Sequence, residues 1–217
     1  MNDLKKPLTK LAVLSSLIPG GLLATANASP VAITQVEHGG SGCPQGTPVK
    51  ASLSHDSQIL KLEYPGFRVI TGEEYSKREG RKSCQLTVSL KYPTNLTYAL
   101  VEYDTSGYAF LLEGAEAKQT VSYYFSNEPD DVTFEEVFKG PYLGGQYVTR
   151  DRIKGPPKWA PCHEGKPVNI KTAIWVSRDA ANFPGSIGVL GAGKGHGSLH
   201  QDFGIIWKQC ATPEPTP

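Results

Sequence analysis

The sequence predicts an all-β protein, an antiparallel β-sandwich or flattened barrel with long loops and two disulfides. In residues 83–92, apolar and polar side chains alternate without a fault. A period of two is typical of a strand with one face on a core and the other in water. Glycine (23) and proline (17) are frequent, which favours many turns and short strands. No apolar stripe at helical spacing is sustained along the chain.

Other segments with strand character follow one another, with turn signals between them. In the first half of the chain they are residues 49–53, 59–64, 67–71, 83–92 and 98–103, with a weaker candidate at 108–112. In the second half they are residues 117–125, 142–153, 168–177, 186–190 and 203–209, while 132–138 fits either a strand or a single helical turn. The charged run 72–82 is expected to be a solvated loop, because mixed charges favour contact with water.

The two ends of the chain differ in composition from its middle. Residues 1–28 have the layout of a secretory signal, with lysines at the start, a short apolar run and small residues before a cleavage point after Ala28. A membrane anchor is the alternative, but an apolar run of about 13 residues is too short to span a bilayer. We expect a flexible leader over 29–41, a single β-sandwich domain over 42–210 and a mobile proline-rich tail over 211–217.

An even number of cysteines in an exported protein predicts disulfides, and no two cysteines are close enough in sequence for a zinc motif. The four are Cys43, Cys84, Cys162 and Cys210. Four cysteines allow three pairings. If 49–53 and 59–71 form a hairpin, and the strand that starts at Cys84 runs antiparallel to 59–71, Cys43 lies beside Cys84. If 168–177 pairs with 203–209, Cys162 lies near Cys210. We therefore predict the disulfides Cys43–Cys84 and Cys162–Cys210.

Several short sequence phrases follow one another along the chain in an order typical of one family. They are G-C-P-Q-G at 42–46, R-K-S-C-Q-L at 81–86, Y-Y-F-S at 123–126, F-K-G-P-Y at 138–142, W-A-P-C at 159–162 and W-K-Q-C at 207–210. Together they resemble the small secreted proteins of the family called domain of unknown function 4360, over residues 42–210. The resemblance implies export and a cysteine framework. It implies no activity, so no catalytic residue is carried over, and the glycine-heavy segment 191–197 departs from the family.

Three sequence patterns suggest cofactor or metal chemistry, but each lacks a necessary part. Residues 188–195 resemble a phosphate-binding loop, yet Gly195 stands where a serine or threonine should hold magnesium. His196 and His200 have the spacing of helical metal ligands, but glycines surround them. The acidic turn 127–131 offers oxygen atoms without the regular spacing of a calcium loop. We expect no cofactor and no metal site, and leave calcium at this turn open.

Aromatic side chains are the best candidates for binding a ligand, because exposed flat rings can stack on sugars or contact another protein. The proposed platform consists of Tyr142, Tyr147, Trp159 and Trp175. Trp175 lies on the side of its strand opposite to the apolar residues. For Trp159 and also for Trp207, packing against a nearby disulfide is the alternative. Asn95 begins the sequence N-L-T, which is an N-glycosylation acceptor if the host is eukaryotic.

The overall composition excludes some functions and leaves others open. A formal net charge of +1 gives no nucleic-acid footprint, and no later stretch is apolar enough to span a membrane. No G-x-S-x-G motif is present. We expect a soluble secreted monomer, in the periplasm, the cell wall or the medium, that acts without catalysis by binding a surface glycan or another protein. An extracellular hydrolase of polysaccharide and a structural wall or matrix protein are the alternatives.

Overall fold

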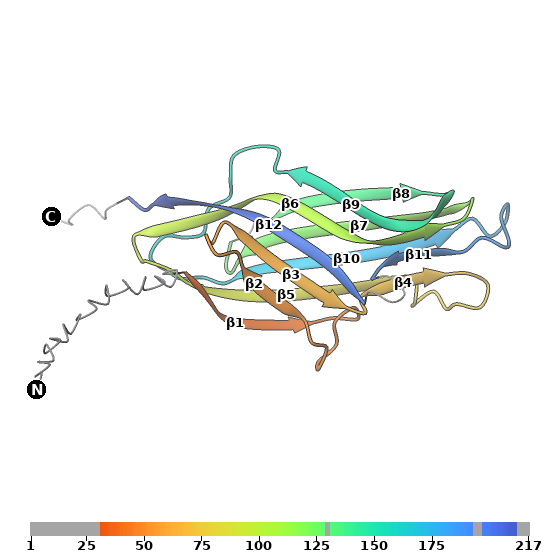
Figure 1. The fold of residues 1–217 in the computed structure, drawn as a ribbon, viewed down its shortest axis with the longest axis horizontal. Coiled ribbons are helices and arrows are strands. Elements are labelled where there is room, and N and C mark those ends of the chain that lie inside the picture. Colours follow the sequence, from red (N-terminus) through yellow and green to blue (C-terminus); the bar gives the residue numbers. More distant parts are fainter. Residues whose placement is uncertain (1–30, 129–130, 193–196, 212–217) are drawn as a thin grey trace, which may run out of the picture.

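The computed structural model describes residues 31–128, 131–192 and 197–211, which form two stacked antiparallel sheets (Figure 1). The sandwich is elongated along its strands. Within these ranges no segment is helical, so none is a helix that could cross a membrane. The expected signal peptide, most of the tail, and the positions Asp130, Lys194 and His196 lie outside the described residues.

The first sheet has five strands and contains the segments with the clearest alternation. Its order is β1 (Ala32–Gly39), β5 (Arg81–Lys91), β10 (Val168–Arg178), β7 (Ala115–Phe125) and β8 (Val132–Lys139). Val88 of β5 lies opposite Val168 of β10, and both are fully buried. Every second residue of these strands faces the other sheet, which is why their sequences alternate.

The second sheet has seven strands, several of them short. Its order is β2 (Lys50–Leu53), β3 (Ile59–Pro65), β12 (Ser198–Gln209), β6 (Leu96–Leu111), β11 (Gly188–Gly191) and β4 (Arg68–Thr71), and β9 (Tyr142–Arg152) also pairs with β6. The long strand β6 pairs with β12 up to Ser106 and with β11 from Tyr108 onward. The long strand β12 and the short strand β11 therefore pair with successive parts of β6.

The core between the sheets contains a hydrogen-bonded polar network as well as apolar side chains. The Gln119 amide of β7 donates to Tyr103 and to the Thr105 hydroxyl (3.1 Å), and its oxygen accepts a hydrogen bond from the Tyr147 hydroxyl (2.8 Å). Gln201 of β12 donates to the Tyr103 hydroxyl at 3.2 Å. These side chains are all buried, and each finds a partner, as most buried polar groups do.

Both predicted disulfides, Cys43–Cys84 and Cys162–Cys210, are confirmed. The strand pairings from which they were inferred are partly wrong. The hairpin of β2 and β3 exists, but β5 pairs with β1 and β10 rather than with β3, and β10 and β12 lie in different sheets. Cys43 reaches Cys84 because the end of β1 lies beside the start of β5, where Gly39 is opposite Gln85.

Close packing at the first disulfide explains one of the sequence phrases. The Gly42 amide donates to the Ser83 carbonyl at 2.8 Å, and a Cβ at position 42 would overlap the ring of the buried Phe67. Glycine is therefore required immediately before Cys43. The phrase G-C-P-Q-G reflects this contact as well as the disulfide.

The expected flexible leader over 29–41 is wrong for most of its length. Ala32–Gly39 form strand β1, whose residues pair with β5 from Lys91 to Gln85. Ile33 and Val36 pack against the core. A strand edge such as that of β5 offers unpaired backbone groups, and β1 satisfies them. Residues 132–138, left between strand and helical turn, belong to strand β8, and the two sheets do not close into a barrel.

Candidate functional site

The outer face of the seven-stranded sheet is covered by charged side chains that largely neutralise one another. Arg150 of β9 forms a two-pronged ion pair with Asp104 of β6, with N–O distances of 2.8 to 3.0 Å. The next outward pair along the ladder, Arg152 and Glu102, also forms an ion pair. A depression of about 780 Å³ near β2 and β3 is lined by further charges, including Lys50 and Glu63, which pair with each other at 3.0 Å. No tryptophan, tyrosine or phenylalanine is among the residues that line this depression.

The outer face of the five-stranded sheet is different, because amides, hydroxyls and two aromatic rings predominate on it. We call six of its residues the polar face: Gln85, Thr87, Tyr124, Asn169, Lys171 and Trp175. Neighbouring strands place them in register, with Asn169 between Thr87 and Tyr124. One ion pair, between Lys118 and Glu135, lies toward the β8 edge.

Hydrogen bonds across the strands fix the side chains of the polar face. The Thr87 hydroxyl donates to the Asn169 amide oxygen at 2.8 Å, and the amide nitrogen of Asn169 donates to Ser126 at 3.0 Å. The Gln85 amide donates to the Tyr124 hydroxyl at 3.3 Å. Groups held in this way lose little further conformational entropy when they bind a ligand.

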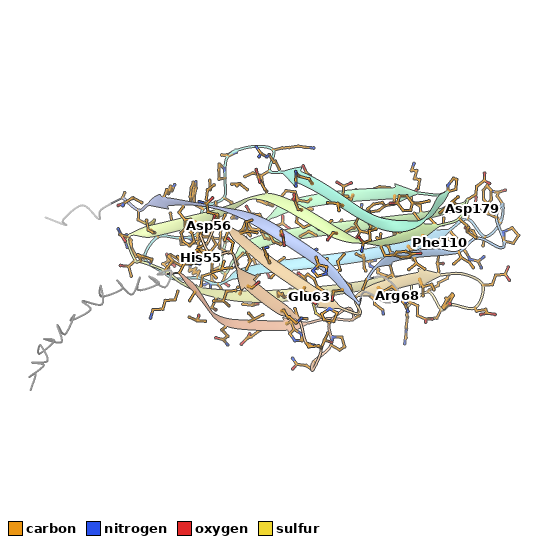
Figure 2. All side chains as sticks on the ribbon, in the orientation of Figure 1. His55, Asp56, Glu63, Arg68, Phe110 and Asp179 are labelled. Carbon is orange, nitrogen blue, oxygen red and sulfur yellow. A yellow bond between two sulfur atoms is a disulfide. The ribbon has the colours of Figure 1, made fainter. Side chains whose placement is uncertain are left out.

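At one end of the polar face, a cleft of about 520 Å³ separates the end of β10 from the loop that follows β4. We call it the Trp175 cleft; among its lining residues are Glu73, Tyr75, Lys77, Arg81, Trp175 and Arg178. In Figure 1 this loop lies at the end of the sandwich opposite the start of β1 and the end of β12. In Figure 2 the labelled Asp179, which directly follows Arg178, marks the same end.

Backbone contacts hold the loop against β10 and so shape the cleft. The Val176 amide donates to the Gly80 carbonyl at 2.8 Å, and the Ile70 amide donates to the Glu79 carbonyl at 3.0 Å. A Cβ at Gly80 would lie 2.9 Å from the Val176 carbonyl oxygen, too close for any other residue without a shift. The Ser76 amide and hydroxyl both donate to the Glu79 carboxylate, at 2.9 and 3.0 Å, which fixes the turn.

The aromatic platform expected from the sequence is not assembled. Trp175 lies on the outer face of its strand as expected, opposite Arg81 on one side and Lys118 on the other. Tyr147 is buried, with 5% of its surface exposed, and its hydroxyl is bonded to Gln119, so its place in an exposed platform is wrong. Burial in the apolar core raises the pKa of Tyr147.

The other two expected platform residues lie away from Trp175. Tyr142 of β9 is partly buried and packs against the core. Trp159 is half-buried, with the Lys208 Nζ atom 4.0 Å from its ring centroid. The Trp207 ring lies 5.4 Å from the Tyr98 ring, and its indole nitrogen donates to the Ser57 carbonyl. Packing of Trp207 against a disulfide stays a prediction.

The remaining candidate positions are only partly described. Asn95 is exposed in a turn, and the Thr97 hydroxyl of the same motif donates to the buried Ala160 carbonyl at 2.6 Å. Glycosylation there stays a prediction. His200 is exposed on β12, without His196 among the described residues to complete a pair. Within those residues no group of three or more histidine, cysteine, aspartate or glutamate side chains could hold a metal.

Sequence reasoning missed Tyr75, Arg81, Arg178 and Tyr124. Tyr75 lies in the segment assigned to a solvated charged loop, and one tyrosine among seven charged residues was the available signal. Arg81 was assigned to the end of the charged loop but begins strand β5, and Tyr124 falls on the outward side of a recognised strand. Alternation does not reveal which outward residues become neighbours. Their neighbours depend on the order β5–β10–β7, which was not predicted.

Comparison with known proteins places the chain among uncharacterised secreted proteins. The family model "Domain of unknown function (DUF4360)" matches residues 29–210. A protein of Arthroderma benhamiae named "Uncharacterized secreted protein" is 31% identical over 181 residues, which is 83% of this chain and 72% of the relative.

Two solved structures are similar only at a low level. The structure of TmCBM61 in complex with beta-1,4-galactotriose has 10% sequence identity and a TM-score of 0.25, with 84% of this chain and 91% of that chain covered. The enzymatically active domain of tailspike protein 4 from bacteriophage CBA120 has 10% identity and a TM-score of 0.27, with 83% of this chain aligned to 20% of the tailspike chain. Scores this low carry no argument about ligand or activity.

Proposed function

The chain belongs to the family named Domain of unknown function (DUF4360), and we propose that it binds extracellular carbohydrate without cleaving it. The protein is a secreted β-sandwich with two disulfides. The observation that carries the proposal is the Trp175 ring, which stands at the junction of the polar face and the Trp175 cleft.

The side chains of this surface complement the chemical groups of a sugar chain. Sugar rings present apolar C–H faces, which stack on aromatic rings, and hydroxyl groups, which exchange hydrogen bonds with amides and hydroxyls. Trp175 and Tyr75 supply the rings, and Gln85, Thr87 and Tyr124 supply hydrogen-bonding groups along the strands. The outer face of the other sheet offers mainly charges that already have partners.

The distribution of carboxylates supports binding rather than hydrolysis. Glycoside hydrolysis commonly uses two carboxyl groups about 5 to 10 Å apart, one on each side of the bond that is cleaved. Among the residues that line the Trp175 cleft, Glu73 alone carries a carboxylate. The pair that hydrolysis would require is therefore not provided by this cleft.

The experiment is a retention assay of the exported protein on a panel of insoluble and soluble polysaccharides, with release of reducing sugar measured in parallel. We expect at least one polysaccharide to retain the protein, and Trp175→Ala to weaken this binding by about fivefold or more, since stacking on a ring is worth on the order of 1 kcal/mol. The matched control is Trp159→Ala, which removes a half-buried tryptophan outside this surface.

Thermal unfolding of both variants separates loss of binding from loss of folding. Binding that survives in a folded Trp175→Ala protein would contradict the proposed surface. Release of sugar without retention would support the hydrolase alternative and overturn the proposal.

A further inference from the structure

We infer that the Trp175 cleft binds a sugar residue that carries an anionic group, a carboxylate or a sulfate. This inference rests on the proposed function and names the class of sugar. Its starting point is the charge of the cleft. The lining residues include three cations, Lys77, Arg81 and Arg178, against the single carboxylate of Glu73.

None of these three cations forms an ion pair with any residue in the described part of the chain. Two nearby carboxylates are engaged elsewhere: Glu79 accepts hydrogen bonds from Ser76, and Asp179 accepts one from the Asn182 amide at 2.7 Å. Unpaired positive charges in a cleft raise the local concentration of anions and are free to contact them.

The arginines of the opposite sheet provide an internal comparison. Arg150 and Arg152 lie on an open sheet surface, and each is paired with a carboxylate on the neighbouring strand β6. Lys118, which lies beside Trp175 on β7, is likewise paired, with Glu135 at 2.6 Å. The cleft is the place where this chain leaves two guanidinium groups without a counter-charge next to aromatic rings, within the residues that the structure describes.

The geometry suits recognition of an acidic sugar. Arg81 on β5 is directly opposite Trp175 on β10, so a ring stacked on the indole would place its substituents near the guanidinium. Arg178 is partly anchored, because its Nη1 atom donates to the Pro184 carbonyl, and its other N–H groups remain for a ligand. Guanidinium groups bind carboxylate and sulfate through two parallel hydrogen bonds, a geometry that lysine cannot offer.

The test compares sugar chains that differ only in charge. The probes are polygalacturonate and its fully methyl-esterified form, then dextran sulfate and dextran, with polyglutamate as an anionic chain without sugar. For at least one pair, we expect the charged form to bind about tenfold more tightly or better at low ionic strength, with the advantage shrinking as salt is added.

Three variants assign the effect to the cleft. Arg81→Gln and Arg178→Gln should bring binding of the acidic chain down to that of its neutral partner. Arg152→Gln, which removes a paired arginine from the opposite sheet, is the matched control and should keep the preference. The two pairs of probes distinguish a carboxylate from a sulfate as the preferred group.

Each remaining outcome has one meaning. Equal binding of charged and neutral chains, or a preference that survives both arginine variants, overturns the inference and leaves carbohydrate binding intact. Equal binding of polyglutamate overturns it as well, because the site would then select charge without sugar. Failure to bind any carbohydrate, neutral or acidic, would refute the proposed function itself.

Discussion

Gln119 links the two sheets inside the core through three hydrogen bonds. Its side chain extends from β7 and contacts the hydroxyl groups of Tyr103, Thr105 and Tyr147, which all belong to the other sheet. Each of these side chains is at most 5% exposed. An apolar core fixes the distance between two sheets, and such directional bonds also fix their register.

The Tyr147 hydroxyl should therefore matter more for stability than a hydroxyl buried without a partner. Tyr147→Phe leaves the Gln119 oxygen unpaired, and we expect the free energy of unfolding to fall by about 1 to 3 kcal/mol. Tyr98 is the matched control, because its buried hydroxyl has no hydrogen-bond partner and Tyr98→Phe should be neutral or stabilising. Urea denaturation of both variants measures the difference; equal losses would contradict a role for the network.

Glu63 gives a prediction about pH. The hydrogen bond from the Lys50 ammonium, followed by that from the Ser198 hydroxyl, lowers the pKa of the Glu63 carboxyl below its usual value of 4.5. Because the pKa of Glu63 is lower in the folded state than in the unfolded state, the ionised carboxylate adds to the free energy of unfolding at pH values above the unfolded-state pKa. This stabilisation is lost as the pH falls through the folded-state pKa. Glu63→Gln should cost less than about 1 kcal/mol at neutral pH, as for a partly exposed ion pair.

The difference between the Glu63→Gln variant and the parent should disappear in acid, below the pKa of the folded state. Urea unfolding at a series of pH values tests this expectation. The control for loss of a charge is the same replacement, Glu74→Gln, at an exposed residue that forms no ion pair among the described residues. A Glu63→Gln effect that stays constant down to acid pH would show that the ion pair is not its cause.

At the scale of elements, the two disulfides fasten different parts of the sandwich. Cys43–Cys84 joins the turn after β1 to β5 within one sheet, and both cysteines are fully buried. Cys162–Cys210 joins the loop before β10 to the chain after β12, and so links the two sheets at one end. Cys162 and Cys210 are only half-buried.

The second disulfide should be the first to be reduced, because exchange requires access of a thiolate to a sulfur atom. Under mild reductant without denaturant, we expect alkylation at Cys162 and Cys210 before Cys43 and Cys84, as measured by peptide mass spectrometry. Replacing Cys162 and Cys210 by alanine should lower stability by up to about 4 kcal/mol in the chain-entropy model. Reduction of both disulfides at the same rate would indicate that the whole sandwich opens first.

At the scale of the molecule, both sheets contribute to one hydrophobic core. The buried cluster includes residues from the two sheets, such as Leu86 and Val121 from one and Leu100 and Phe203 from the other. A shared core makes the two sheets depend on each other, because each sheet buries its apolar inner face only by packing against the other. That the sandwich is a single domain stays a prediction, which this dependence supports.

Unfolding should therefore occur in one cooperative step. We expect scanning calorimetry to show a single transition in which the calorimetric and van't Hoff enthalpies agree. Tryptophan fluorescence and far-ultraviolet circular dichroism should report the same midpoint, since Trp175 belongs to one sheet and Trp207 to the other. Two resolved transitions would mean that the sheets unfold separately.

Local pattern was enough to predict much of this protein from its sequence. Alternation over 83–92 and 168–177 identified β5 and β10 and the side of each that faces the core. Four cysteines led to the correct disulfides, although the pairing of β5 with β3 assumed for the first was wrong. The outward position of Trp175 followed from the same alternation.

The tertiary structure alone decided which strands are neighbours, and with that the candidate site. Whether Ala32–Gly39 is a leader or a strand depends on the free edge of β5, about 50 residues further along the chain. Tyr147 is buried because β9 lies over Gln119 of the opposite sheet, a contact that no local pattern encodes. Tyr75, Arg81 and Trp175 meet because a loop, β5 and β10 converge, and strand alternation specifies a face but not the residues that share it.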